Sequence, residues 1–270
     1  MSGSSRNPAR DAFTVGWALK TGAATLTPDD DLESARGAFI TAMRANDQEW
    51  SPRASYVLSE MMLQHGDADS AERYLHVALR SSHPDWKPAA DVLEGLIRAS
   101  RGDVAGAAGA YERAIATRHT THCPNARFNL GALHQQHGEA AAAVEAFRQA
   151  MASRHREYAP RAAVNLGFVL FNQVRDIEGA RKAFHEAIAT GHPEQSLLAE
   201  KNLEALDAFV ENPGSWAAVN DTVDVSKLES PPHKARFLVK PGADKDSSRS
   251  FWGKFLGPVS KVWPDRSGGG

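Results

Sequence analysis

The chain has 270 residues, of which 24% are charged, and a formal net charge of −2 at pH 7. This balance argues against a general electrostatic attraction to nucleic acid or to anionic membranes. The single cysteine, Cys123, excludes an internal disulfide and suits a reducing compartment. The start of the chain lacks the apolar core of a signal peptide, and no apolar run is long enough to span a membrane. We therefore expect a soluble, cytoplasmic protein.

Residues 1–10 are expected to be disordered, and a helical array is expected to begin near residue 11. The stretch DDLESARGAFITAM at 30–43 carries the pattern of a second helix of a repeat. Its partner helix is expected within 11–25, a segment that matches the later repeats poorly. Terminal repeats of an array are expected to be atypical because solvent covers one side of them.

Four stretches that start at residues 66, 102, 138 and 175 repeat one pattern at spacings of 36, 36 and 37 residues. Each has alanine five and twelve residues after its start and a large residue between them, on one helical stripe. These residues are Ala71, Leu75 and Ala78; Ala107, Tyr111 and Ala114; Ala143, Phe147 and Ala150; and Ala180, Phe184 and Ala187. Such a period indicates stacked helical repeats.

A partner helix is expected before each stretch, opening with a proline at the first helical position, where no hydrogen bond is lost. These prolines are Pro52, Pro88, Pro124 and Pro160. A glycine turn that needs positive φ then leads into the alanine-rich helix. With a closing helix near 196–209, the pattern predicts about five helix pairs plus one helix over residues 11–211.

The repeats resemble the tetratricopeptide repeat family through Asn-Leu-Gly at 129–131 and 165–167, the Gly-Asp/Glu turn and Ala-x-x-Ala-[Tyr/Phe]-x-x-Ala. The period is longer than the usual 34 or so, and the subtype looks like one common in high-GC bacteria. The resemblance implies an all-α, right-handed α-solenoid that acts as a scaffold or adaptor. It also implies a protein or peptide partner bound in a concave groove lined by the first helices.

The residues that the resemblance places in this groove are Arg53, Tyr56, Phe128, Asn129, Arg161, Asn165, Phe168, Phe171, Lys201 and Asn202. Asparagine amides can bond the backbone of an extended ligand, and Arg161 with Lys201 can hold a carboxylate. Phe128, Phe168 and Phe171 are the expected aromatic anchors. The alternative is that the asparagines only satisfy neighbouring helices.

Histidines recur in the loops that follow the second helices, at His83, His119, His155 and His192, with His122 nearby. Their separation by whole repeats argues against a shared metal ion. We expect instead that they interact with free carbonyl groups at helix carboxyl ends.

No motif of an enzyme, P-loop or metal site is present, so neither catalysis nor a cofactor is expected. The alternative function is binding of single-stranded RNA by the helical repeats. That function needs a basic groove, whereas residues 1–225 have a net charge of −7, the total of −2 less the +5 of the residues that follow.

Residues 212–270 lose the period and are expected to form an irregular or disordered extension that ends in glycines of uncertain origin. A basic, aromatic motif at 251–263 includes Phe251, Trp252, Phe255, Leu256 and Trp263. It is expected to cover the repeats or the groove, to dock on another protein or an anionic surface, or to be inert. The sequence does not identify the partner, the oligomeric state or the pathway.

Overall fold

The structure, a computed structural model, describes residues 7–21 and 28–211, which form helices and no strand. In chain order these are α1 (Pro8–Lys20), α2 (Pro28–Arg44), α3 (Trp50–Gln64), α4 (Ala68–Arg80), α5 (Trp86–Ser100), α6 (Val104–Ala116), α7 (His122–Gln136), α8 (Ala140–Ala152), α9 (Tyr158–Val169), the π-helical turn η1 (Leu170–Val174), α10 (Ile177–Ala189) and α11 (Pro193–Glu211). The predicted all-α solenoid is confirmed. Within this part of the chain, no helix has the length and apolar character needed to cross a membrane.

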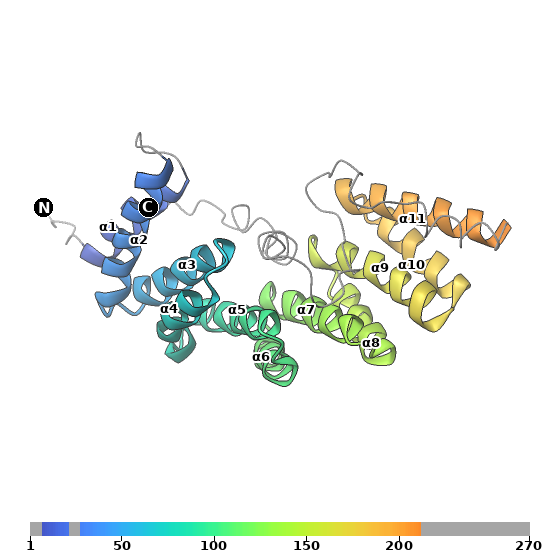
Figure 1. The fold of residues 1–270 in the computed structure, drawn as a ribbon, viewed down its shortest axis with the longest axis horizontal. Helices are drawn as coiled ribbons and strands as arrows, with labels where there is room; N and C mark the ends of the chain where they lie inside the picture. Colours follow the sequence, from blue (N-terminus) through green and yellow to red (C-terminus); the bar gives the residue numbers. More distant parts are fainter. Residues whose placement is uncertain (1–6, 22–27, 212–270) are drawn as a thin grey trace, which may run out of the picture.

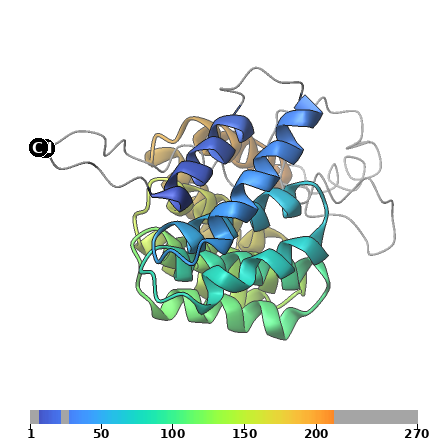
Figure 2. The ribbon, with the colours of Figure 1, turned by 90° about the vertical axis from the view of Figure 1, so that its left-hand side faces the viewer.

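The helix pairs stack side by side into an arc (Figure 1). In each pair the first helix packs on the second, and α11 closes the array against α10 and α9. The first helices α3, α5, α7 and α9 also contact one another in succession and follow the inner side of the arc, whereas α4, α6 and α8 follow its outer side. Seen from the end of the array, α1 and α2 stand in front of the later pairs (Figure 2). First helices therefore build the concave side.

In three pairs a glycine of the first helix lies under an aromatic ring of the second. The pairs are Gly95 with Tyr111, Gly131 with Phe147 and Gly167 with Phe184. A Cβ atom on these glycines would come within 2.3, 2.7 and 2.5 Å of the ring, which is closer than carbon atoms approach. The predicted alanine stripe of the second helices is buried beside these rings. The glycine of Asn-Leu-Gly is thus a packing residue.

The first two pairs also place a small residue of the first helix under a large residue of the second, but with other residues or a looser contact. In α3, Ser59 stands where the later first helices have glycine, and in α4 the smaller Leu75 stands where the later second helices have an aromatic residue. The Ser59 hydroxyl also donates to the carbonyl oxygen of Ala71 at 2.6 Å. In the terminal pair, a Cβ atom on Gly16 of α1 would lie 3.0 Å from the ring of Phe39 in α2. The segment that matched the repeat poorly therefore supplies the expected partner helix.

In the four pairs from α3–α4 to α9–α10, the turn between the two helices contains a residue with positive φ. In three turns it is glycine: Gly66, Gly102 and Gly138, with φ of 80°, 78° and 74°. In the fifth pair it is Arg175, with φ of 65°. In this pair Arg175 stands 15 positions after Pro160, whereas Gly138 stands 14 positions after Pro124. The extra residue is accommodated by η1, because a π turn is a one-residue insertion in an α-helix.

Replacing Arg175 by glycine is expected to raise the free energy of unfolding by about 1 kcal/mol, because a residue with a Cβ atom is strained in the left-handed region. The reverse change, Gly102→Arg, is expected to lower it by a similar amount. Urea denaturation of both variants measures the effect. An unchanged or lower stability of Arg175→Gly would contradict the prediction.

The helix starts differ from the sequence prediction in two ways. The prolines occupy the third helical position and not the first, since α7 begins at His122, two residues before Pro124. Proline fits there because the N–H groups of a first turn have no carbonyl acceptor within the helix. In addition, α1 begins at Pro8, inside the segment 1–10 that was predicted to be disordered. The side chain of Asn7 stabilises this start by accepting two backbone N–H groups.

Candidate functional site: the concave face of the first helices

Two of the first helices carry an arginine at the same position of the repeat. Arg53 lies in α3 and Arg161 lies three repeats later in α9, whereas α5 and α7 have Ala89 and Asn125 at this position. Positions shared by every copy serve the packing that every copy needs. A difference between copies on the concave side is therefore where a specific partner contact is best sought.

Arg53 is surrounded by aromatic rings. Its guanidinium carbon lies 4.6 Å from the ring centre of Phe13, 5.0 Å from that of Trp50 and 5.6 Å from that of Trp86. Burial lowers the pKa of this guanidinium, and the carboxylate of Glu49 partly offsets the shift. The three rings come from α1, α3 and α5, so they hold the cation across two junctions of the array.

Arg161 is held in a similar way at the other end of the inner face. Its guanidinium carbon lies 5.0 Å from the ring centre of Phe128 in α7, and Nη1 lies 3.7 Å from the carboxylate of Glu157. The Phe128 ring itself packs against Phe147 and Tyr158, at 6.0 and 6.2 Å between ring centres. This stack joins α7 to α9.

A buried polar cluster, which the sequence analysis missed, lies on the same side. Lys20 of α1 donates to the carboxylate of Glu60 in α3 at 3.1 Å. Burial raises the pKa of Tyr56 well above its usual value, and Glu60 adds to the shift. Burial likewise raises the pKa of Tyr158 in α9 to about 12, and Glu60 is one of the charges that act on it. Side chains of α3 and α9, about a hundred residues apart, therefore influence each other electrostatically.

The three phenylalanines predicted to be anchors differ in exposure. Phe128 is 5% exposed and Phe171 is 8% exposed, and the Phe171 ring packs edge-on against Phe209 at 5.1 Å. Phe168 is half-buried. Phe128 and Phe171 thus present little surface to a partner, and Phe168 is the aromatic residue of this set best placed to contact one.

The predicted asparagines bond mainly within their own helices. Asn129 is buried, and its Nδ2 donates to Oδ1 of Asn125 at 2.7 Å. Asn202 donates to the carbonyl oxygen of Leu198 at 2.8 Å. Asn165 is buried, whereas Lys201 is exposed on α11. This pattern favours the packing interpretation for Asn129 and Asn202.

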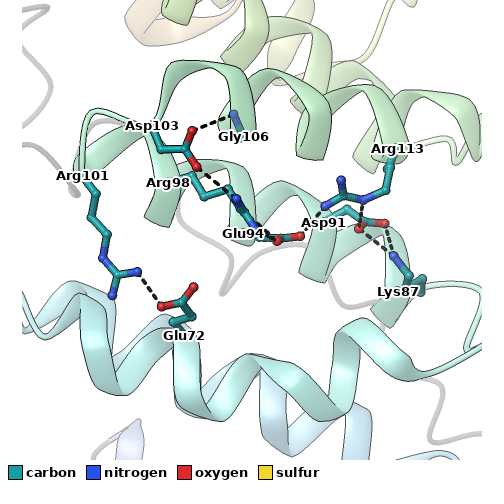
Figure 3. Close-up of polar contacts among 9 residues, drawn as sticks. All are labelled: Glu72, Lys87, Asp91, Glu94, Arg98, Arg101, Asp103, Gly106 and Arg113. Atoms are coloured by element: carbon teal, nitrogen blue, oxygen red, sulfur yellow. Dashed lines mark hydrogen bonds and ion pairs between the residues drawn. The ribbon is translucent and has the colours of Figure 1, made fainter.

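The pair α5–α6 contains a network of charged side chains (Figure 3). Asp91 of α5 is 1% exposed, and both its oxygens lie 2.6 Å from Nζ of Lys87. Nε of Arg113 in α6 donates to Oδ1 of the same carboxylate at 3.2 Å. Glu94 connects Arg113 to Arg98, which donates to it at 2.8 Å. The spacing of these residues along α5 is the sequence signal that would have identified the network.

The histidines that follow the second helices have a different role from the predicted one. We call His83, His119, His155 and His192 the loop-histidine row. Nδ1 of His83 accepts the backbone N–H groups of Asp85 and Trp86 at 3.2 and 3.4 Å. His119 and His155 likewise accept two N–H groups each at the start of α7 and α9, and His192 accepts one, from Gln195 of α11. The expectation that they bind carbonyl groups of the preceding helix is wrong, because they cap the helix that follows.

The remaining site predictions concern the tail and metal binding. Phe251, Trp252, Phe255, Leu256 and Trp263 lie outside the described residues. Within residues 7–21 and 28–211, no group of three or more histidine, cysteine or carboxylate side chains is arranged to hold a metal ion.

Comparison with known proteins identifies the repeat. Residues 92–154, which run from within α5 to just beyond α8, match the family model of the tetratricopeptide repeat. No curated protein matches the chain. The chain is similar to the crystal structure of BtubC (BKLC) from P. vanneervenii, with 15% sequence identity and a TM-score of 0.46 over 87% of this chain and 98% of that one. The match supports the assignment of the central repeats, residues 92–154, to the tetratricopeptide repeat family.

Proposed function

We propose that this protein is a non-catalytic adaptor that holds a peptide or a protein segment on the concave face of its repeats. Tetratricopeptide repeats generally mediate protein–protein interactions, which supports the class of function. The observation that carries the proposal is the pair of arginines, Arg53 and Arg161, stacked on aromatic rings at equivalent positions of α3 and α9. A guanidinium held by stacking loses little further freedom when it binds a partner.

The partner would bind where the inner face offers both charge and apolar surface. Phe168 lies two turns after Arg161 on α9 and is half-buried, and Lys201 is exposed on α11, which packs against α9. These side chains would add an apolar and a cationic contact for the partner. Large aromatic and arginine side chains usually dominate the binding energy of such interfaces. The protein is proposed to work in the cytoplasm of a bacterium.

Affinity capture from the source cells tests this proposal, followed by titration of the captured partner. The double variant Phe168→Ala/Lys201→Ala is expected to weaken binding at least tenfold, since a lost hot spot costs about 1–2 kcal/mol or more. The control Arg148→Ala/Lys182→Ala changes exposed side chains of the second helices α8 and α10 and should bind normally. Equal binding by the groove variant and wild type would refute the groove model.

Affinity capture also tests the proposed role of the tail, and a separate binding assay tests the nucleic-acid alternative. If the motif at 251–263 covers the groove, full-length Trp252→Ala/Trp263→Ala should capture more partner than wild type. If the motif is itself a docking segment, this variant should capture less. A salt-sensitive gel shift with single-stranded RNA would instead support the nucleic-acid alternative.

A further inference from the structure

Three members of the loop-histidine row, His83, His119 and His192, tie their repeat to the one before it. In each of these histidines, Nε2 lies close to a carboxylate of the preceding repeat. His83 Nε2 lies 2.8 Å from Glu49, His119 Nε2 lies 2.9 Å from Asp85, and His192 Nε2 lies 3.4 Å from Glu157. Each carboxylate residue directly precedes a first helix. Because Nδ1 accepts backbone N–H groups, Nε2 carries the ring proton and donates it to the carboxylate. One neutral imidazole thus caps its own repeat and binds the previous one.

Asp47 shows the same arrangement without an imidazole. It stands one repeat before His83, and its Oδ1 accepts the N–H groups of Glu49 and Trp50 at 2.9 and 2.8 Å. Its Oδ2 accepts from Nδ2 of Asn7 at 2.9 Å, which ties it to α1. At this position Asp47, like His83, His119 and His192, supplies an acceptor for the next helix and a bond to the preceding pair.

One joint of the row lacks its carboxylate. Thr121 takes the position that Glu49, Asp85 and Glu157 hold in the other repeats. His155 caps α9 as the others cap their helices, but within the described residues no carboxylate of the preceding repeat pairs with it. His155 is therefore held by its cap and by its ring contact with Tyr158, at 5.0 Å between ring centres.

The charges around this joint are mostly unfavourable to a protonated histidine. The pKa of His122 is lowered to about 4, mainly by burial and in part by His119 and His155, while Asp85 partly opposes the shift. The rings of His119 and His122 lie 4.6 Å apart. Burial also lowers the pKa of His155 against the attraction of Glu157. The other charged residues of the two loops are all cations: Arg118, Arg154 and Arg156.

We propose that the junction between α7–α8 and α9–α10 is a pH-sensitive joint of the solenoid, which loosens on protonation of His122 and His155 while the carboxylate-tied joints hold. A protonated imidazole has hydrogen on both nitrogens, so Nδ1 no longer accepts and the cap is lost. At a tied joint the attraction between imidazolium and carboxylate offsets this loss. Across this joint Arg161 stacks on Phe128, so loosening it also changes the concave face.

The direction of the effect follows from the pKa values. A histidine whose folded-state pKa lies below its usual value of about 6.5 binds fewer protons in the folded state than in the unfolded state. The joint is therefore most stable above about pH 6.5. It weakens as the pH falls toward about 4, where folded His122 itself titrates.

Amide hydrogen exchange of the full-length protein at pH 7.5 and 5.0 tests the proposal. After correction for intrinsic exchange, protection of α7–α10 is expected to fall about tenfold more than that of α3 and α4, since one unit of pKa corresponds to tenfold. Thr121→Asp supplies the missing carboxylate and should remove most of this extra loss. His155→Asn keeps an oxygen acceptor for α9 without titrating and should do the same.

The matched control is His185→Asn, an exposed histidine of α10, which should leave the extra loss unchanged. Uniform loss of protection in all helices would overturn the proposal, as would an extra loss that persists in Thr121→Asp. Circular dichroism at pH 7.5 identifies a His155→Asn protein that fails to fold. In that event the Thr121→Asp result alone decides the outcome.

Discussion

Replacing Lys87 and Arg113 together by methionine is expected to lower the free energy of unfolding by about 3–5 kcal/mol. The two cations are partners of the Asp91 carboxylate, which is almost fully buried between α5 and α6. Without them the carboxylate remains buried with no compensating charge, and its desolvation is no longer offset. Guanidinium denaturation followed by circular dichroism measures the change.

Adding Asp91→Ala to this variant is expected to restore most of the lost stability, because Ala163 occupies the equivalent position in α9. Arg101→Met is the matched control. Its partners Asp69 and Glu72 are exposed, so it should cost less than about 1 kcal/mol. If the double variant is as stable as wild type, the network does not compensate a buried charge.

Gly131→Ala is expected to cost about 1–3 kcal/mol, although alanine is the better helix former. Its Cβ atom would stand 2.7 Å from two carbons of the Phe147 ring, which is fully buried and has no space to retreat. The matched control is Gly109→Ala in α6, where nothing lies within 4 Å of the new Cβ atom. That change should stabilise the protein by about 1 kcal/mol. Thermal unfolding of both variants measures the difference.

A double-mutant cycle separates steric conflict from other effects of this change. Gly131→Ser combined with Phe147→Leu reproduces the natural combination of Ser59 and Leu75 in the first full repeat. The double variant is expected to be more stable than the sum of the single changes, by about 0.5–3 kcal/mol. Purely additive changes would show that the glycine is not required by the ring.

The helix pairs were predictable because the contacts that define them join residues close in sequence. Gly131 and Phe147 are 16 residues apart, and the same interval recurs between Gly95 and Tyr111. A local contact of this kind must be rebuilt in every repeat, so it leaves a period in the sequence. The π turn at Leu170–Val174 was not predicted, even though the extra residue of that repeat is visible in the spacing.

The concave site could be predicted only in part. The resemblance places Arg53 and Arg161 in the groove, but the rings that hold them, Phe13 for one and Phe128 for the other, come from neighbouring helix pairs. The burial of Phe171 against Phe209 likewise depends on the closing helix, to which the repeat pattern assigns no contact. The exposure of a side chain on the inner face depends on how each helix pair is rotated relative to the next. The repeat pattern of the sequence does not contain this rotation.

The sequence by itself determined the architecture: the period, the glycine turns and the alanine stripe describe a stack of helix pairs, because each pair satisfies its packing within one repeat. Only the tertiary structure decided which side chains meet between repeats. Lys20 reaches Glu60 and His83 reaches Glu49, whereas Thr121 stands where His155 would otherwise meet a carboxylate of the preceding repeat. These partners lie 34 or more residues apart, and the superhelical stacking of whole pairs brings them together.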